Sequence, residues 1–193
     1  VTYIKIMKQQ DLEYARIELS VKAKNGIDFI TSASIIWVLI TFIWTLSYSA
    51  YHKSVFTLMA SGIMLPLAFT FSKVYKTQWK IQENPLQPLG LILNLAQLFY
   101  FPFLILCLIK FPEYFVPAYA IITGAHFFPY AWFYKEPSYG VFAGIIPLFS
   151  FLISLVVPEK EIYYVPAFTA FCLAILGILI FIRTRKSKIE NKA

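Results

Sequence analysis

Six uncharged apolar runs, each long enough to cross a lipid bilayer, set the limits on what this chain can fold into. Because an α-helix rises about 1.5 Å per residue, roughly 20 apolar residues span the hydrocarbon core of a membrane. Hydrophobic residues make up 59% of the 193 residues and charged residues 14%, which is more apolar surface than a soluble domain of this length can bury. The sequence therefore predicts six membrane-spanning helices, at residues 29–51, 54–72, 89–109, 114–134, 140–157 and 163–182.

Lysine and arginine are distributed unevenly over the connections between these runs. The first, third and fifth connections carry only Lys53, Lys110 and Lys160, whereas the other fourteen of the 17 basic residues lie in the two end segments and the second and fourth connections. Since positive residues accumulate on the cytoplasmic side, both termini are predicted to be cytoplasmic. We therefore predict an all-α integral membrane protein, a six-helix bundle of three hairpins. No nucleic-acid partner is expected, because the charges are scattered over loops and tails.

Three parts are predicted along the chain. They are a cytoplasmic N-terminal segment, a transmembrane domain and a basic cytoplasmic tail, at residues 1–26, 27–182 and 183–193. Apolar residues at helical spacing predict one amphipathic helix over 11–25, with Asp11 as its N-cap and Gly26 at its end. This helix either lies along the inner leaflet or extends the first span.

Polar and aromatic side chains recur on matching faces of the third and fourth spans. In the fourth span they follow intervals of four, three and four residues, which places them on one helical face. Gln97 and His126 lie at the same depth in neighbouring antiparallel spans, so a hydrogen bond between them is allowed. Polar groups in lipid need partners and should face the bundle interior. The candidate ligand-binding residues are Trp37, Asn94, Gln97, Tyr119, Thr123, His126 and Tyr130.

Two interpretations of these residues stay open. They line a ligand site, or they join helices through hydrogen bonds worth about 0.6–2 kcal/mol each. His126 is the only histidine inside a predicted span, and an ionisable residue in that position is a functional candidate by default.

Prolines and small residues predict the shape and packing of the bundle. A proline leaves the carbonyl four residues back without its donor, which predicts kinks at Pro66, Pro129 and Pro147 and a widened cavity in the cytoplasmic half. A bundle whose helices merely curve is the alternative. Small residues let helices approach closely. Helix packing, within the bundle or between protomers, is predicted at Gly140, Gly144, Ala170 and Ala174.

Several kinds of chemistry find no support in the sequence. No Asp or Glu lies inside a predicted span, so a carboxylate relay for protons or sodium is not expected. Cys107 and Cys172 lie at different depths, which disfavours a disulfide, and no metal-ligand spacing or nucleophile motif is present. We predict no catalytic residue, no metal and no cofactor.

Three segments carry a resemblance to known proteins. They are SGIMLPLAF (61–69), ENPLQPLG (83–90) and GAHFFPYAWFY (124–134). Over about residues 11–157 the chain resembles a family of small, uncharacterised multi-pass membrane proteins of low-GC Gram-positive bacteria, and the most specific part is Gly-Ala-His-Phe-x-Pro-Tyr. The resemblance implies a bacterial plasma membrane and a multi-span topology, but no activity.

Binding of a small or lipid-like ligand, with transport as its extension, is the leading expectation for function. The ligand would occupy a cavity between the first four spans that opens toward the cytoplasm. One alternative is a membrane-embedded enzyme that acts on lipids with His126 as general base. Another is a structural or stress-associated membrane component that forms a homo-oligomer through Gly140 and Gly144.

Overall fold

Every regular element in residues 9–190, the part of the chain that this computed structural model describes, is a helix. Five helical segments are long and apolar enough to cross a membrane: Lys24–Thr45, Ala50–Tyr75, Gln87–Lys110, Pro137–Val156 and Glu159–Arg185. They match five of the six predicted spans. The remaining predicted span, at 114–134 and fourth in chain order, is divided between two shorter helices and is not among the five. Predictions for residues 1–8 and 191–193 lie outside the described residues.

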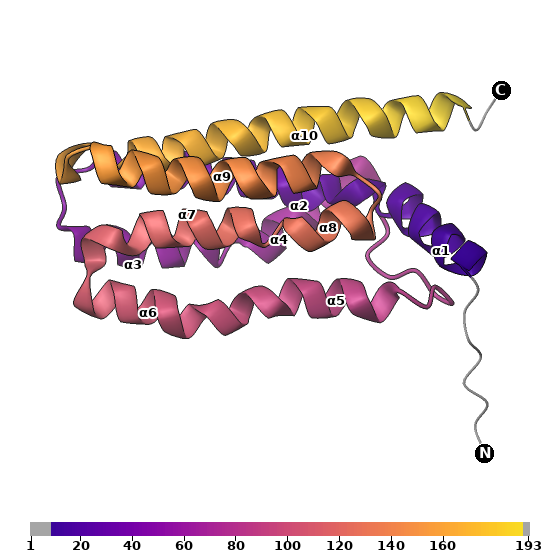
Figure 1. Ribbon diagram of the computed structural model, residues 1–193, viewed down its shortest axis with the longest axis horizontal. Coiled ribbons are helices and arrows are strands. Elements are labelled where there is room, and N and C mark those ends of the chain that lie inside the picture. Colours follow the sequence, from indigo (N-terminus) through magenta and orange to yellow (C-terminus); the bar gives the residue numbers. More distant parts are fainter. Residues whose placement is uncertain (1–8, 191–193) are drawn as a thin grey trace, which may run out of the picture.

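The helices run side by side, and consecutive long ones run in opposite directions (Figure 1). In chain order they are α1 (Gln9–Lys22), α2 (Ile27–Thr45), α3 (Ala50–Ser61), α4 (Met64–Tyr75), α5 (Gln87–Ala96), α6 (Phe101–Lys110), α7 (Phe115–Ala125), α8 (Phe128–Phe133), α9 (Pro137–Val156) and α10 (Tyr164–Glu190). Short 3-10 segments η1 to η4 occupy Lys24–Gly26, Gln97–Tyr100, Pro112–Tyr114 and Glu159–Glu161.

The predicted end of the first span was wrong. The first span ends at Thr45 rather than at residue 51, because the chain becomes extended at Leu46 and Ser49 caps the next helix by accepting a hydrogen bond from the His52 amide. At the other extreme, α10 continues as a helix through the charged segment to Glu190. Arg183, Arg185, Lys186 and Lys188, which follow the last predicted span, are therefore carried on a helix.

The core is centred on α2, α7, α9 and α10. The most extensive packing joins α2 to α10 and α7 to α9, and it buries Ile40, Ile146 and Leu173 completely. In contrast, no residue of α5 is buried. Large apolar side chains are exposed along every long helix, as expected where lipid replaces water as the surrounding solvent.

The small residues predicted to pack helices fall into two groups. Ala170 is buried, and a side chain at Gly140 would contact Ala131. Gly144 and Ala174 are exposed, and nothing lies within 4 Å of the position that a Cβ atom on Gly144 would occupy. The prediction that Gly144 and Ala174 pack helices within the bundle is therefore wrong. Contact between protomers stays a prediction.

The N-terminal helix α1 docks on the end of the bundle where the loop 76–86 and the end of α10 also lie (Figure 1). Ala15 and Leu19 are buried against the bundle. The prediction that α1 extends the first span is wrong, since Lys24, Asn25 and Gly26 in η1 have positive φ and separate it from α2. Asp11 is not the N-cap, because the helix has begun by Gln9.

Polar contacts hold α1 in this position. The Arg16 Nε donates to the Trp132 carbonyl at 2.8 Å, and its guanidinium lies over the Trp132 ring. The side chain of Glu13 pairs with Lys135, and this hydrogen bond holds the pKa of the Glu13 carboxyl below its usual value. The Nδ2 of Asn84 donates to the Ala15 carbonyl at 2.9 Å. α1 is thus attached to both α8 and the loop 76–86.

Candidate functional site

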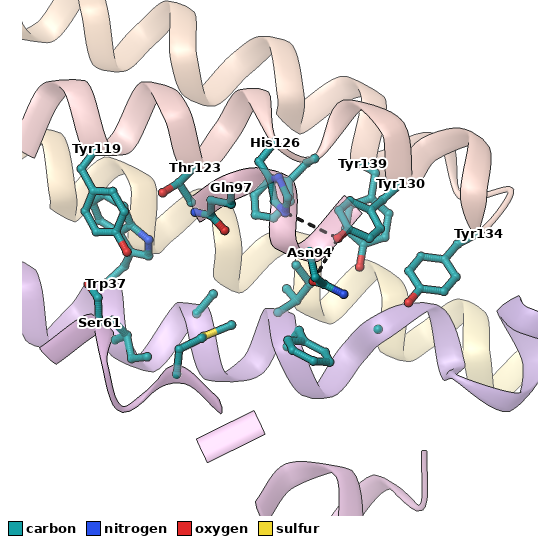
Figure 2. Close-up of a pocket in the computed structure, with 17 residues that line it drawn as sticks. Trp37, Ser61, Asn94, Gln97, Tyr119, Thr123, His126, Tyr130, Tyr134 and Tyr139 are labelled. Atoms are coloured by element: carbon teal, nitrogen blue, oxygen red, sulfur yellow. Dashed lines mark hydrogen bonds between the residues drawn. The ribbon is translucent and has the colours of Figure 1, made fainter. Parts of the chain in front are cut away.

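A cavity of about 110 Å³ lies between α2, α4, α5, α7, α8 and α9. All seven residues proposed from the sequence as ligand contacts line it, and Figure 2 shows their side chains gathered around one space. Two alternative roles, ligand binding and helix joining, both require such proximity. That these residues bind a ligand therefore stays a prediction. The lining also includes residues that sequence reasoning did not select, namely Gly26, Phe29, Ile30, Ala33, Ile36, Ser61, Met64, Phe127, Tyr134 and Tyr139.

Three helices are interrupted where they border the cavity. α3 gives way to α4 at Gly62 and Ile63, a 3-10 segment begins at Gln97, and α7 gives way to α8 at His126 and Phe127. Ser61, Gln97 and His126, which lie at these interruptions, all line the cavity. The interruptions supply polar side chains at one level of an otherwise apolar wall.

A proline follows each interruption within a few residues. They are Pro66, Pro102 and Pro129, and a proline withdraws one donor from the turn before it. At two of the interruptions an amide bonds to the carbonyl three residues back rather than four. Ile63 N donates to the Ala60 carbonyl at 3.2 Å and Phe127 N to the Gly124 carbonyl at 3.0 Å. Pro102 was not among the prolines predicted to kink a helix, although it too lies inside a predicted span. α9 continues through Pro147 as one helix.

Tyr130 connects two helices across the cavity wall. Its hydroxyl donates to the Asn94 Oδ1 at 3.0 Å and lies 3.5 Å from the His126 Nε2 (Figure 2). The hydrogen bond that the sequence allowed between Gln97 and His126 is not formed, and the His126 Nε2 lies instead against the hydroxyl of Tyr130, one turn later. The hydrogen bond between Tyr130 and Asn94 thus joins α8 to α5.

Thr123 has a hydroxyl without a partner. The residue is 6% exposed, and its Oγ1 makes no hydrogen bond with any described residue. Other hydroxyls on these helices, such as those of Thr57 and Thr169, bond to the carbonyl four residues back. Leaving a buried hydroxyl unpaired costs about 1–3 kcal/mol. Thr123 is therefore ready to bond to whatever occupies the cavity.

Gln97 is the second polar group of the wall with unused capacity. Its amide makes no hydrogen bond within the described part of the chain, although a side-chain amide offers two donors and an acceptor. Thr123 lies on α7 and Gln97 at the break between α5 and α6, so they face the cavity from different helices. A ligand group between them could bond to both.

Aromatic rings form much of the remaining wall. Trp37 and Tyr119 stack with their centroids 5.2 Å apart. At the end nearer the termini, Tyr130, Tyr134 and Tyr139 lie with their ring centroids about 6 Å from one another, and the Tyr139 hydroxyl donates to the Asn25 carbonyl at 2.6 Å. This tyrosine cluster forms the wall of the cavity at that end of the bundle.

The most exposed part of the lining lies on α5. Asn94 is exposed there, and Gln97 on η2 and Met64 on α4 are partly exposed, as are Phe29, Ser61, His126 and Tyr134. Helices α4 and α5 share at most a marginal contact. The exposure of these residues and the weak contact of the two helices indicate an opening of the cavity sideways between α4 and α5. The predicted opening toward the cytoplasm stays a prediction.

Asp28 anchors the loop below the tyrosine cluster. The residue is 1% exposed, and its Oδ2 accepts hydrogen bonds from Thr77 at 2.6 Å and from the Trp79 ring nitrogen at 2.7 Å. Asp28 lies in the first turn of α2, and these partners lie 49 and 51 residues away in the loop 76–86. Hydropathy alone gives no signal for such a long-range contact.

The described residues offer no metal centre and no paired thiols. Among the side chains that the structure describes, no group of three or more His, Cys, Asp or Glu is placed to hold a metal ion. Cys107 and Cys172 are both buried and both free. The polar groups of the cavity are amides, hydroxyls and one imidazole, which suit hydrogen bonding.

Five long apolar helices, exposed apolar surfaces and an internal cavity define a helical membrane protein. The chain belongs to a family of unknown function, DUF7010, which matches residues 12–183. The predicted membership of an uncharacterised family is thus confirmed, and the match extends beyond the predicted 11–157 to include most of α10. No curated protein and no solved structure matches the chain.

Proposed function

We propose that this protein crosses the bacterial plasma membrane six times and binds a small or lipid-like ligand in its intramembrane cavity. The unpartnered hydroxyl of Thr123 is the observation that carries the binding proposal, because a buried polar group without a partner costs free energy that a bound ligand would recover. Transport would require a second conformation, so binding is the function that the geometry supports best.

The crossing that is missing from the five long helices, the fourth in chain order, is assigned to α7 and α8 together. These helices lie between the outer connection at Lys110 and the inner connection at Lys135, and they pack against α9 along their length. Their interruption and polar residues make this segment the least lipid-like of the six. A broken helix is tolerated at membrane depth where it lines a cavity.

The orientation proposal rests on charge. The end of the bundle that carries α1 also carries Lys73, Lys76, Lys135 and Arg183, whereas the opposite connections hold single lysines. The positive-inside rule then places this end in the cytoplasm. The outward face of α1, with Tyr14, Ile17 and Val21 exposed at helical spacing, would contact the inner leaflet.

Labelling of single cysteines in intact cells tests this topology. A membrane-impermeant maleimide should label His52→Cys and Lys160→Cys, both on outer connections, and should leave Gln10→Cys and Lys135→Cys unlabelled until the cells are opened. Because the native Cys107 and Cys172 are buried, the unmodified protein provides the background. Labelling of Lys135→Cys from outside would contradict six crossings.

Filling the cavity tests the binding proposal. Ala33 lines the cavity on α2, and Ala33→Phe should occupy much of its 110 Å³. Purified protein incubated with a bacterial total lipid extract should retain an amphiphile in native mass spectra, and the variant should retain at least about tenfold less, or about 1.4 kcal/mol in affinity.

The matched control is Ala174→Phe, which adds the same side chain on the exposed face of α10. This variant should retain the amphiphile as the unmodified protein does. If the unmodified protein retains nothing, or if Ala33→Phe retains as much as Ala174→Phe, the cavity does not bind such a ligand. A melting temperature measured for both variants separates loss of binding from loss of the fold.

A further inference from the structure

We infer that the ligand presents an uncharged polar end group to the cavity and leaves its hydrocarbon chain in the membrane between α4 and α5. This inference rests on the proposed binding function and specifies the chemistry of its ligand. It follows from the charge of the wall, from the two unused hydrogen-bonding groups, and from the size and opening of the cavity.

The charge of the wall argues against an ionised end group. Among the described residues that line the cavity, none is Lys, Arg, Asp or Glu. The one ionisable nitrogen of the wall, the His126 Nε2, lies 3.5 Å from the Tyr130 hydroxyl. Transferring a carboxylate or phosphate from water to a site without a permanent cation is strongly unfavourable. The carboxylate of Asp28, which precedes the lining residue Phe29, already accepts hydrogen bonds from Thr77 and Trp79 in the loop.

Hydrogen-bonding capacity identifies the kind of group that fits. Thr123 offers a hydroxyl and Gln97 an amide, and each can both donate and accept. A neutral alcohol or carbonyl placed between them would satisfy the buried Thr123 hydroxyl and would itself remain uncharged. The stacked rings of Trp37 and Tyr119 would contact the carbon atoms next to that group.

Size and opening explain why the rest of the molecule stays outside. A cavity of about 110 Å³ is smaller than the engineered apolar cavity of about 150 Å³ that holds one benzene molecule. It has room for a glycerol-sized group but not for an acyl chain. Since the opening lies between α4 and α5, a chain that leaves the cavity there enters the surrounding lipid.

A pair of soluble lipids that differ only in the phosphate tests this inference. Binding of dioctanoylglycerol and of dioctanoyl phosphatidate to the purified full chain is measured by isothermal titration calorimetry in the same detergent. Dioctanoylglycerol should bind at least about tenfold more tightly, a difference of about 1.4 kcal/mol. Thr123→Val and Gln97→Leu should each weaken its binding by about fivefold or more.

Controls separate failure of this inference from failure of the proposed function. Thr70→Val removes an exposed hydroxyl of α4 that bonds to the Pro66 carbonyl and should leave binding unchanged. Equal or tighter binding of the phosphatidate would overturn the uncharged end group while the binding function stands. If neither lipid binds, or if both bind to Ala33→Phe as well as to the unmodified chain, the cavity is not the site and both proposals fail.

Discussion

Replacing Gly124 with alanine should lower the stability of this protein more than any other single methyl group added to it. A Cβ atom at Gly124 would lie 2.5 Å from the Pro147 Cδ and 2.7 Å from the Ile146 Cβ. Neither atom can move without its backbone, since one belongs to a proline ring and the other is the first atom of a buried side chain. Overpacking of this kind costs about 1–3 kcal/mol, and the rigid contacts favour the upper end.

The measurement is a thermal unfolding curve in detergent. Cys107 and Cys172 are buried and free, so a thiol-reactive dye reports unfolding without further labels. A loss of about 3 kcal/mol should lower the apparent melting temperature by roughly 5–10 °C. Gly144→Ala is the matched control, because nothing lies within 4 Å of its added carbon atom and its effect should stay within about 0.5 kcal/mol. Equal melting temperatures for the two variants would contradict the close contact of α7 with α9.

The same contact orients the cavity wall. Successive residues on a helix point about 100° apart, so the turn that presses Gly124 against α9 directs Thr123 toward the cavity. Gly124→Ala should therefore also weaken ligand binding in proportion to its effect on the helix positions. This connects the stability of the bundle to the geometry of the site.

Removing the cation that neutralises Glu136 is expected to have the second large effect. Glu136 is 3% exposed, caps α9 by accepting a hydrogen bond from the Ser138 amide, and pairs with Arg183 on α10. Removing one partner of a buried ion pair leaves an uncompensated charge and costs about 3–5 kcal/mol. Because the Arg183 side chain is about half exposed, we expect Arg183→Ala to cost about 3 kcal/mol, near the lower end.

Two further variants make this result specific. Arg185→Ala removes an exposed guanidinium that lies over the Phe181 ring, and it should cost no more than about 1 kcal/mol. The double variant Arg183→Ala with Glu136→Gln removes the buried charge together with its partner and should recover much of the lost stability. If the double variant unfolds as readily as Arg183→Ala alone, the effect comes from lost packing of the arginine rather than from the charge of Glu136.

Sequence patterns anticipated much of the candidate site. A spacing of four, three and four residues was enough to place Tyr119, Thr123, His126 and Tyr130 on one side of the fourth span, because helical periodicity depends only on local geometry. Because the third and fourth spans are antiparallel neighbours, counting residues from their ends placed Asn94 and Gln97 near the depth of His126. These inferences needed no knowledge of how the helices are rotated about their axes.

The details that depend on that rotation could not be predicted. Whether His126 lies against Gln97 or Tyr130, and whether the Thr123 hydroxyl bonds to a carbonyl, depends on how each helix is rotated about its axis. The face of α1 is a similar case. Ala15 and Leu19 pack on the bundle while Ile17 and Val21 are exposed, and the sequence contains apolar residues on both faces.

Hydropathy and charge by themselves determined that this chain forms apolar helices suited to lipid and that its basic residues gather at alternate connections. Both properties are sums over neighbouring residues, so they can be read without a structure. Only the tertiary structure decided where the cavity opens and that Gly124 has no room for a side chain between α7 and α9. It also decided that the carboxylates of Asp28 and Glu136 are buried with partners far away in the chain. Those features arise where segments far apart in the chain come into contact, and the free energy of such a contact depends on the positions of both segments.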